Sequence, residues 1–250
     1  MGSAGPPDAA YDDRDVTSPV DRATRVTAIE AVIFDMDGLL IDSEPVWDSV
    51  RRAMADEAGS TWTRADHQAV MGVSTEEWAD HMIDRLGLRQ SREEVIEHVI
   101  ERMAASYRSG IPWLPGALAA IDLAASHYPT ALASGSHPAL IDVVTADDAV
   151  RGKFEVIVAA DEVGAGKPAP DVYLAAAERL GAEPASCVCL EDSGNGIRSG
   201  VRAGMKVIAV PDPRFPPATD VLEQADLVLP SLSELTVEHL AHPEARSAAG

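Results

Sequence analysis

The sequence predicts an α/β protein with a parallel-sheet core and an inserted all-α cap domain. Short apolar runs alternate along the chain with helical patterns, which is typical of βαβ units. One long segment directly after the first apolar run contains helical patterns only. The length of 250 residues leaves room for one large α/β domain or for two smaller ones.

Each predicted strand is a run rich in Val, Ile and Ala, as expected for strands buried on both faces of a parallel sheet. The runs are 29–34, 130–134, 155–160, 186–191, 205–210 and 226–229. The clearest helix between them is 170–180, which prolines open and Gly181 closes. The pattern predicts a Rossmann-like core made of residues 28–42 and 114–241.

The segment 43–113 is predicted to be a helical cap. It has no strand-like run, and its amphipathic helix patterns lie at 45–58, 75–86 and 92–108. The chain returns to the core near Trp113-Leu114-Pro115-Gly116, whose proline and glycine suit a connection. The two ends, 1–27 and 242–250, lack periodicity and are predicted to be flexible tails.

Charge and composition exclude several classes of partner. The net charge of −21 repels polyphosphate backbones, so no binding of nucleic acid is expected. The longest stretch without a charged residue, 123–141, contains two prolines and is not a membrane span. The residues before Glu30 contain several aspartates and no apolar run, so we do not expect them to be a secretory signal. We therefore expect a cytoplasmic protein, monomeric rather than oligomeric, that does not bind a membrane.

Both cysteines, Cys187 and Cys189, lie in one apolar run and are predicted to be buried thiols. On a strand we expect them to point to opposite faces. Neither a disulfide between them nor a shared metal ion is then expected.

Polar residues follow four of the predicted strands at the point where each strand ends. In chain order they are Asp35-Met36-Asp37-Gly38, Ser134-Gly135-Ser136, Gly166-Lys167-Pro168 and Glu191-Asp192-Ser193. The ligand crevice of an open parallel sheet lies beyond the carboxyl ends of its strands, so these groups are expected to converge. Converging carboxylates repel one another unless a divalent cation lies among them. Oxygen ligands alone favour Mg²⁺ over zinc.

Each of these residues also has a purely structural interpretation. Asp35 or Asp192 alone is typical of a helix N-cap, and Ser134 alone is typical of a turn. The Gly166-Lys167 pair lacks the further residues of a Walker phosphate loop. The complete set, which includes one of only three lysines in the chain, favours a functional site over these structural interpretations.

Four segments resemble the ordered motifs of the haloacid dehalogenase superfamily. They are DMDGLLIDSE at 35–44, LAS at 132–134, KPAPD at 167–171 and LEDSGNG at 190–196. The resemblance spans residues 28–240 and is closest to the branch of β-phosphoglucomutase and the sugar-phosphate phosphatases, including those acting on 2-deoxyglucose 6-phosphate and hexitol phosphates. It implies a Mg²⁺-dependent phosphatase that hydrolyses a small phosphomonoester, a sugar or polyol phosphate, through an aspartyl-phosphate.

The resemblance also implies catalytic roles. Asp35 attacks phosphorus, and Asp37 protonates the leaving alcohol and then deprotonates water. Ser134 grips the transferring phosphoryl group, and Lys167 neutralises the charge of the nucleophile. An acid two residues after the nucleophile is absent from the true dehalogenases, so cleavage of a carbon–halogen bond is disfavoured.

Metal and substrate ligands follow from the same resemblance. The expected Mg²⁺ ligands are Asp35, Asp37 through its backbone carbonyl, Asp192 and Glu191. Glycines allow the backbone to approach phosphate closely, and the cap is expected to select the leaving group. The expected substrate-binding residues are Gly38, Gly135, Ser136, Ser43, Glu44 and Trp47.

A sugar phosphomutase is the main alternative function. In the phosphomutases that the chain resembles, a histidine stands where this chain has Trp47, and an arginine follows the Gly-Val-Ser turn where this chain has Thr75-Glu76-Glu77. Those acids would repel a second phosphate, although acids are also typical of the first turn of a helix. Other cap residues that could supply a positive charge are Arg51, Arg52 and His81. A non-catalytic binding protein on the same fold is a more distant alternative.

Overall fold

A single sheet of six parallel strands forms the centre of the protein. The computed structural model describes residues 28–71 and 73–243. The strand order is β3-β2-β1-β4-β5-β6, and every neighbouring pair is parallel. The strands are β1 (Ala31–Phe34), β2 (Thr130–Ser134), β3 (Val156–Ala159), β4 (Cys187–Glu191), β5 (Lys206–Ala209) and β6 (Leu227–Val228). Each lies within one predicted apolar run, and the predicted fold class is confirmed.

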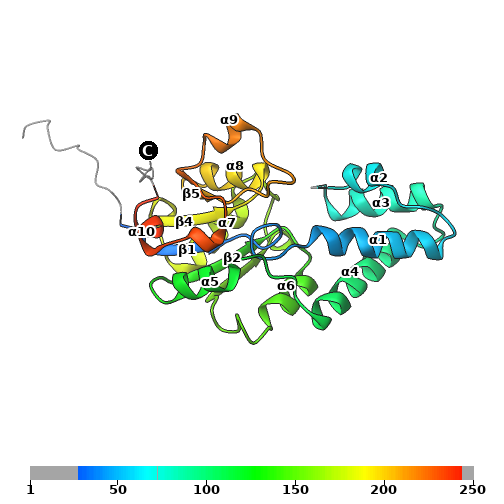
Figure 1. The fold of residues 1–250 in the computed structure, drawn as a ribbon, viewed down its shortest axis with the longest axis horizontal. Coiled ribbons are helices and arrows are strands. Elements are labelled where there is room, and N and C mark those ends of the chain that lie inside the picture. Colours follow the sequence, from blue (N-terminus) through cyan, green and yellow to red (C-terminus); the bar gives the residue numbers. More distant parts are fainter. Residues whose placement is uncertain (1–27, 72, 244–250) are drawn as a thin grey trace, which may run out of the picture.

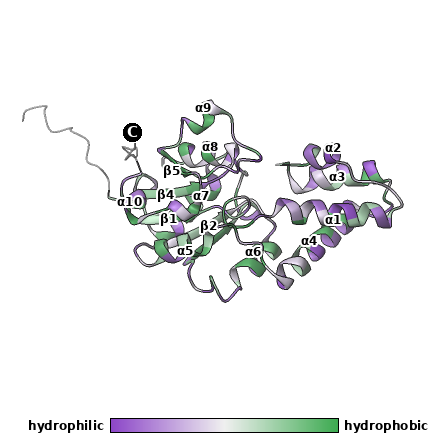
Figure 2. Cartoon of the chain, viewed as in Figure 1, coloured by the Kyte–Doolittle hydropathy of each residue, from purple (hydrophilic) through white to green (hydrophobic). Residues whose placement is uncertain are grey.

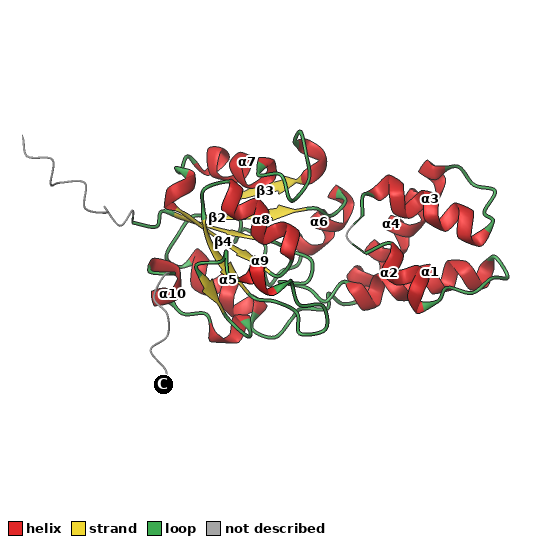
Figure 3. Ribbon diagram, turned by 90° about the horizontal axis from the view of Figure 1, so that it is seen from above, coloured by secondary structure: helices red, strands yellow, loops and turns green. Residues whose placement is uncertain are grey.

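Helices cover both faces of this sheet (Figures 1 and 3). On β1, Val32 and Phe34 belong to one buried cluster, and Ala31 and Ile33 belong to the other. The first cluster includes side chains of α5 (Ala117–Ala125), α6 (Pro138–Thr145) and α10 (Val237–Ala241). The second includes side chains of α7 (Asp171–Leu180), α8 (Gly194–Arg202) and α9 (Thr219–Leu222). Burial on both faces explains why the strands are almost entirely apolar (Figure 2).

Short 3₁₀ turns complete the core. They are η1 (Ala160–Glu162), η2 (Pro184–Ser186) and η3 (Leu232–Glu234). Helix α7 begins one residue later than predicted and ends at Gly181, which adopts a left-handed conformation with φ 71°. Its buried residues pack against β1, β2 and β3.

The cap consists of four helices inserted after β1, on the side to which the carboxyl ends of the strands point (Figure 1). They are α1 (Glu44–Glu57), α2 (Arg64–Ala69), α3 (Thr75–Leu86) and α4 (Arg92–Ser109). Three of them match the predicted helices within one residue at either end. Helix α2 was not predicted, because six residues are too few to show a helical period. The capping box between Thr63 and Asp66 was the available signal for its start.

Two chain segments that run side by side connect core and cap. Ile41 and Trp113 form an antiparallel bridge, the Asp42 N–H donates to the Pro112 carbonyl at 2.8 Å, and the Leu114 N–H donates to the Leu40 carbonyl at 2.8 Å. The predicted division into a core and a cap of residues 43–113 places its boundaries in this paired segment and stays a prediction. The predicted tails, 1–27 and most of 242–250, lie outside the described residues.

The two cysteines are free and fully buried, as predicted. The prediction that Cys187 and Cys189 point to opposite faces is wrong, since residues two apart on a strand share a face, and both belong to the same buried cluster. Within the described part of the chain, no helix combines the length and the apolar character that a membrane span requires.

Candidate active site

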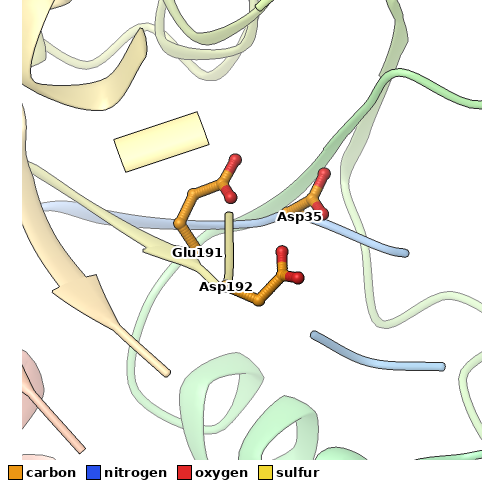
Figure 4. Close-up of side chains that lie close together, drawn as sticks. All are labelled: Asp35, Glu191 and Asp192. Carbon is orange, nitrogen blue, oxygen red and sulfur yellow. The ribbon is translucent and has the colours of Figure 1, made fainter. Parts of the chain in front are cut away.

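Three carboxyl groups converge at the carboxyl edge of the sheet (Figure 4). Asp35 directly follows β1, Glu191 ends the neighbouring strand β4, and Asp192 comes next. Each offers an oxygen that lies within 4.8 Å of the others. Parallel pairing of β1 with β4 therefore brings together residues that are far apart in the sequence.

Lys167 provides the positive charge beside these acids. Its Nζ lies 2.6 Å from Asp35 Oδ1 and 2.6 Å from Glu191 Oε1, and it donates to the Ala133 carbonyl at 3.1 Å. Burial alone would lower the pKa of Lys167, but the two adjacent carboxylates raise it above its usual range. The lysine is therefore held as a cation between the two carboxylates.

One cation does not balance three acids. Burial raises the pKa of Asp35 to about 7; Lys167 opposes that shift, and the charge of Glu191 adds to it. Burial, with the charges of Glu191 and Asp35, also raises the pKa of Asp192 well above its usual range. Asp192 Oδ1 is buried and has no hydrogen-bond partner among the described residues. Excess negative charge and a free oxygen fit a hard divalent cation held by these three acids.

Asp37 lies beside this cluster and is bound by serine hydroxyls. Ser136 Oγ donates to Asp37 Oδ2 at 2.6 Å, and Ser134 Oγ lies 3.5 Å from the same oxygen. Ser134 Oγ also accepts from the Ser136 N–H at 3.0 Å. The other oxygen, Asp37 Oδ1, is buried and lacks a partner in the described part of the chain. The carboxyl group of Asp37 is thus oriented by Ser136, with one oxygen left for another ligand.

Two glycines leave space for the acids. A Cβ atom at Gly38, where φ is +80°, would lie 2.2 Å from Asp192 Oδ2. A Cβ atom at Gly196, in α8, would lie 1.8 Å from the carboxyl carbon of Glu191. Gly135, by contrast, has no atom within 4 Å of such a position. A side chain at Gly38 or Gly196 would therefore overlap a carboxyl group of the site, whereas a side chain at Gly135 would not.

Sequence reasoning missed Tyr173, on α7. Its hydroxyl donates to Glu191 Oε1 at 2.6 Å and accepts from Lys167 Nζ at 3.2 Å. Lys167 Nζ also lies 4.8 Å from the centre of the ring, a cation–π distance. The apolar stripe of this helix indicated only a core position, and the sequence carried no signal that the hydroxyl faces the site.

On the cap side, the structure places Glu44 near Asp37. Burial raises the pKa of Glu44, His67 and Arg51 oppose the shift, and the negative charge of Asp37 adds to it. The Nε2 atom of His67, from α2, lies 3.1 Å from Glu44 Oε2. Ser43 is buried at the start of α1, where its carbonyl accepts the N–H groups of the first turn.

Trp47 packs inside the cap. Its ring centre lies 5.8 Å from that of Trp78, and the guanidinium of Arg51 lies 4.8 Å above it. Arg52 is instead exposed and bonds to Asp48 at 2.7 Å. His81 stacks edge-on against Trp62, with 5.8 Å between ring centres. The three cap residues that the sequence could not place, Arg51, Arg52 and His81, therefore all contact other cap side chains.

The fold and the site place this chain in a class of enzymes that combine a parallel α/β core, with acids and a lysine at the carboxyl edge of its sheet, and a helical cap inserted after the first strand. Within that class the chain belongs to the haloacid dehalogenase-like hydrolase family, whose profile matches residues 29–204.

Named relatives agree with this assignment. Hexitol phosphatase B of Escherichia coli (strain K12) is 38% identical over 224 residues, which cover 85% of this chain and 96% of that protein. A phosphorylated carbohydrates phosphatase of Thermotoga maritima is 33% identical over 183 residues, 72% of this chain and 84% of that protein. The crystal structure of β-phosphoglucomutase from Clostridium difficile has a TM-score of 0.69 at 24% identity, over 84% of this chain and 95% of that chain, a likeness of fold alone. The prediction of a phosphoric monoester hydrolase is confirmed at the level of the family.

Proposed function

We propose that this protein is a Mg²⁺-dependent phosphatase that hydrolyses a small sugar or polyol phosphate through an aspartyl-phosphate. The observation that carries the proposal is the position of Lys167, 2.6 Å from both Asp35 and Glu191. A lysine in this position keeps Asp35 able to approach a phosphate dianion, because it offsets the negative charge of the nucleophile.

In the proposed reaction, Asp35 Oδ attacks phosphorus in line, and the bond from phosphorus to the leaving oxygen breaks. Asp37, held by Ser136, donates its proton to that oxygen and then takes a proton from the water that hydrolyses the aspartyl-phosphate. Ser134 and the backbone amides beside it bind the phosphoryl oxygens.

Mg²⁺ is proposed to be held by Asp35, Asp192, the backbone carbonyl of Asp37 and Glu191, the last directly or through water. When bound, the ion neutralises charge on the transferring group. The donor set consists of oxygen atoms only, which suits Mg²⁺ better than zinc.

The names of the relatives support a carbohydrate or polyol substrate, since the two quoted above are phosphatases of hexitols and of phosphorylated carbohydrates. Hydrolysis is favoured over phosphomutase activity by the cap, because Arg52 and His81 contact cap residues and Arg51 is stacked on Trp47. Arg51 is buried inside the cap, and Arg52 is already paired with Asp48. A cytoplasmic, monomeric protein without a nucleic-acid partner stays a prediction.

The test is an assay of inorganic phosphate with hexitol, hexose, nucleotide and aryl phosphates, with Mg²⁺ and with EDTA. We expect release of phosphate that EDTA abolishes and a preference for polyol or sugar esters. Asp35→Asn should abolish turnover and leave the fold intact. Absence of turnover on every ester, or an active Asp35→Asn protein, would contradict the proposal.

A second assay separates hydrolysis from phosphomutase activity. The enzyme is incubated with Mg²⁺, β-glucose 1-phosphate and a trace of the 1,6-bisphosphate, and glucose 6-phosphate and inorganic phosphate are both followed. Rapid formation of glucose 6-phosphate with negligible phosphate release would establish the phosphomutase instead.

A further inference from the structure

A tyrosine to which the sequence analysis gave no role lies where the cap meets the core. Tyr107 is in the last turn of α4, and three residues later the Gly110 N–H donates to its carbonyl at 3.1 Å. The chain then reaches Pro112, whose carbonyl accepts from Asp42 at 2.8 Å, two residues before α1 begins at Glu44. Helices α1 and α4 pack against one another. The last turn of α4 therefore lies beside the first turn of α1.

The same end of the cap is close to the catalytic acids. Helix α4 also packs against α6, which directly follows the loop whose Ser136 holds Asp37 Oδ2 at 2.6 Å. Burial, with the negative charges of Asp37 and Glu44, raises the pKa of Tyr107 above its usual range. Those charges act on the hydroxyl because the elements that carry Asp37, Glu44 and Tyr107 meet at one place.

The hydroxyl of Tyr107 and Asp37 Oδ1, both near this junction, have no hydrogen-bond partner among the described residues. Tyr107 is only 2% exposed, and its hydroxyl makes no hydrogen bond to any described residue. Asp37 is partly exposed, but its Oδ1 atom is buried and also lacks a hydrogen-bond partner there. The ring of Tyr107 is packed within an apolar cluster, so its hydroxyl is the polar part of a side chain otherwise surrounded by hydrocarbon. Most buried polar atoms in proteins have a hydrogen-bond partner, and a ligand bound at this junction would supply the partners that these two atoms lack.

We propose that Tyr107 is a specificity-determining residue that binds the hydroxyl group on the substrate carbon next to the ester carbon. The inference rests on the proposed phosphatase function and narrows its substrates to phosphate esters with such a hydroxyl, as in a hexitol 6-phosphate. In this arrangement Asp37 Oδ1 contacts the ester oxygen of the substrate. The hydroxyl that Tyr107 binds is then on the carbon directly bonded to the ester carbon. Tyr107 then donates a hydrogen bond to this hydroxyl, and the carboxylate of Glu44 accepts one from it.

The test compares D-sorbitol 6-phosphate with its 5-deoxy analogue, which lacks only that hydroxyl. We expect the wild type to favour the hydroxylated ester about tenfold in kcat/KM, and Tyr107→Phe to reduce this ratio to near one. Because the hydroxyl is unpartnered without substrate, the ligand-free variant should also have a Tm above that of the wild type. Tyr128→Phe is the matched control, because Tyr128 lies just before the amino end of β2, at the other end of the strands from the site. This variant should keep the wild-type ratio of kcat/KM between the two esters.

An equal loss on both esters in Tyr107→Phe, with a lower Tm, would assign the residue to packing and overturn the inference. A wild-type ratio near one would also overturn it while leaving the phosphatase function in place. If the wild type releases phosphate from none of the esters, including an aryl phosphate, the proposed function fails together with the inference.

Discussion

Lys167 Nζ lies 2.6 Å from Asp35 Oδ1, across 132 positions of the chain, and this ion pair is almost completely buried. The same ammonium lies 2.6 Å from Glu191, whose side chain is fully buried. A buried carboxylate that loses the cation paired with it is strongly destabilising. We therefore expect this lysine to stabilise the fold around the site and to offset the charge of the proposed nucleophile.

Replacing this lysine should affect both properties. We expect Lys167→Met to lower kcat at least about 100-fold and to reduce the free energy of unfolding of the metal-free protein by about 3 kcal/mol. Lys153→Met is the control, because Lys153 pairs at 2.9 Å with the exposed Asp122 on the surface. That variant should lose less than about 1 kcal/mol. Urea unfolding in EDTA measures the loss of free energy of unfolding in each variant. Equal losses in the two variants would contradict the buried ion pair.

The pKa of Asp35 predicts how the stability of the metal-free protein depends on pH. Its pKa is raised from 3.8 to about 7 in the folded protein, chiefly by burial. Between these two values the folded state keeps the proton and the unfolded chain does not, so this group contributes less stability as pH rises from about 4 to about 7. The asparagine side chain in Asp35→Asn cannot ionise, so this variant lacks that decrease in stability. We expect the free energy of unfolding of the variant, relative to wild type, to rise across that interval in EDTA and to level off above pH 7. A constant difference would refute the shift.

Magnesium should stabilise the protein through the three acids. At a Mg²⁺ concentration 100 times the Kd, binding to the folded state alone adds about 2.7 kcal/mol. Asp192→Asn removes a carboxylate from the cluster and should remove most of the rise in Tm that Mg²⁺ produces. Asp80→Asn is the control, since Asp80 is exposed and pairs with Arg92 within the cap. A rise in Tm that survives in the Asp192 variant would place the metal elsewhere.

The space beside Asp192 gives a matched pair of glycine substitutions. Gly38 and Gly59 both have positive φ, +80° and +67°, so an alanine at either position is strained by about 1 kcal/mol. Only at Gly38 would the added methyl group overlap the carboxylate of Asp192, at 2.2 Å; at Gly59 no atom lies within 4 Å. We expect Gly38→Ala to lose activity and the Mg²⁺-dependent rise in Tm, and Gly59→Ala to keep both. Equal activity in the two variants would contradict a role for this space.

The sequence by itself determined the strands, most of the cap helices and the residues at the strand ends. Strands buried on both faces must be continuously apolar, so the six runs were visible without structural information. Asp35, Ser134 and Glu191 could be predicted to converge because parallel strands bring their carboxyl ends to one edge. Their resemblance to known motifs then gave each an expected role. The wrong assignment of Cys187 and Cys189 to opposite faces was an error of periodicity, since the sequence already contained the right answer.

Only the tertiary structure decided which side chains surround these acids. Tyr173 and Tyr107 are aromatic residues on amphipathic helices, and their helical patterns are satisfied by packing alone. Whether such a hydroxyl meets Glu191, as in Tyr173, or remains unpartnered near Asp37, as in Tyr107, depends on how each helix is rotated and docked. Those rotations are set by contacts between elements far apart in the chain, such as α7 with the sheet and α4 with α6. Local sequence patterns contain no information about such contacts. Hydrophobic burial specifies which face of a helix is covered, but not which group the hydroxyl of a tyrosine on that face will contact.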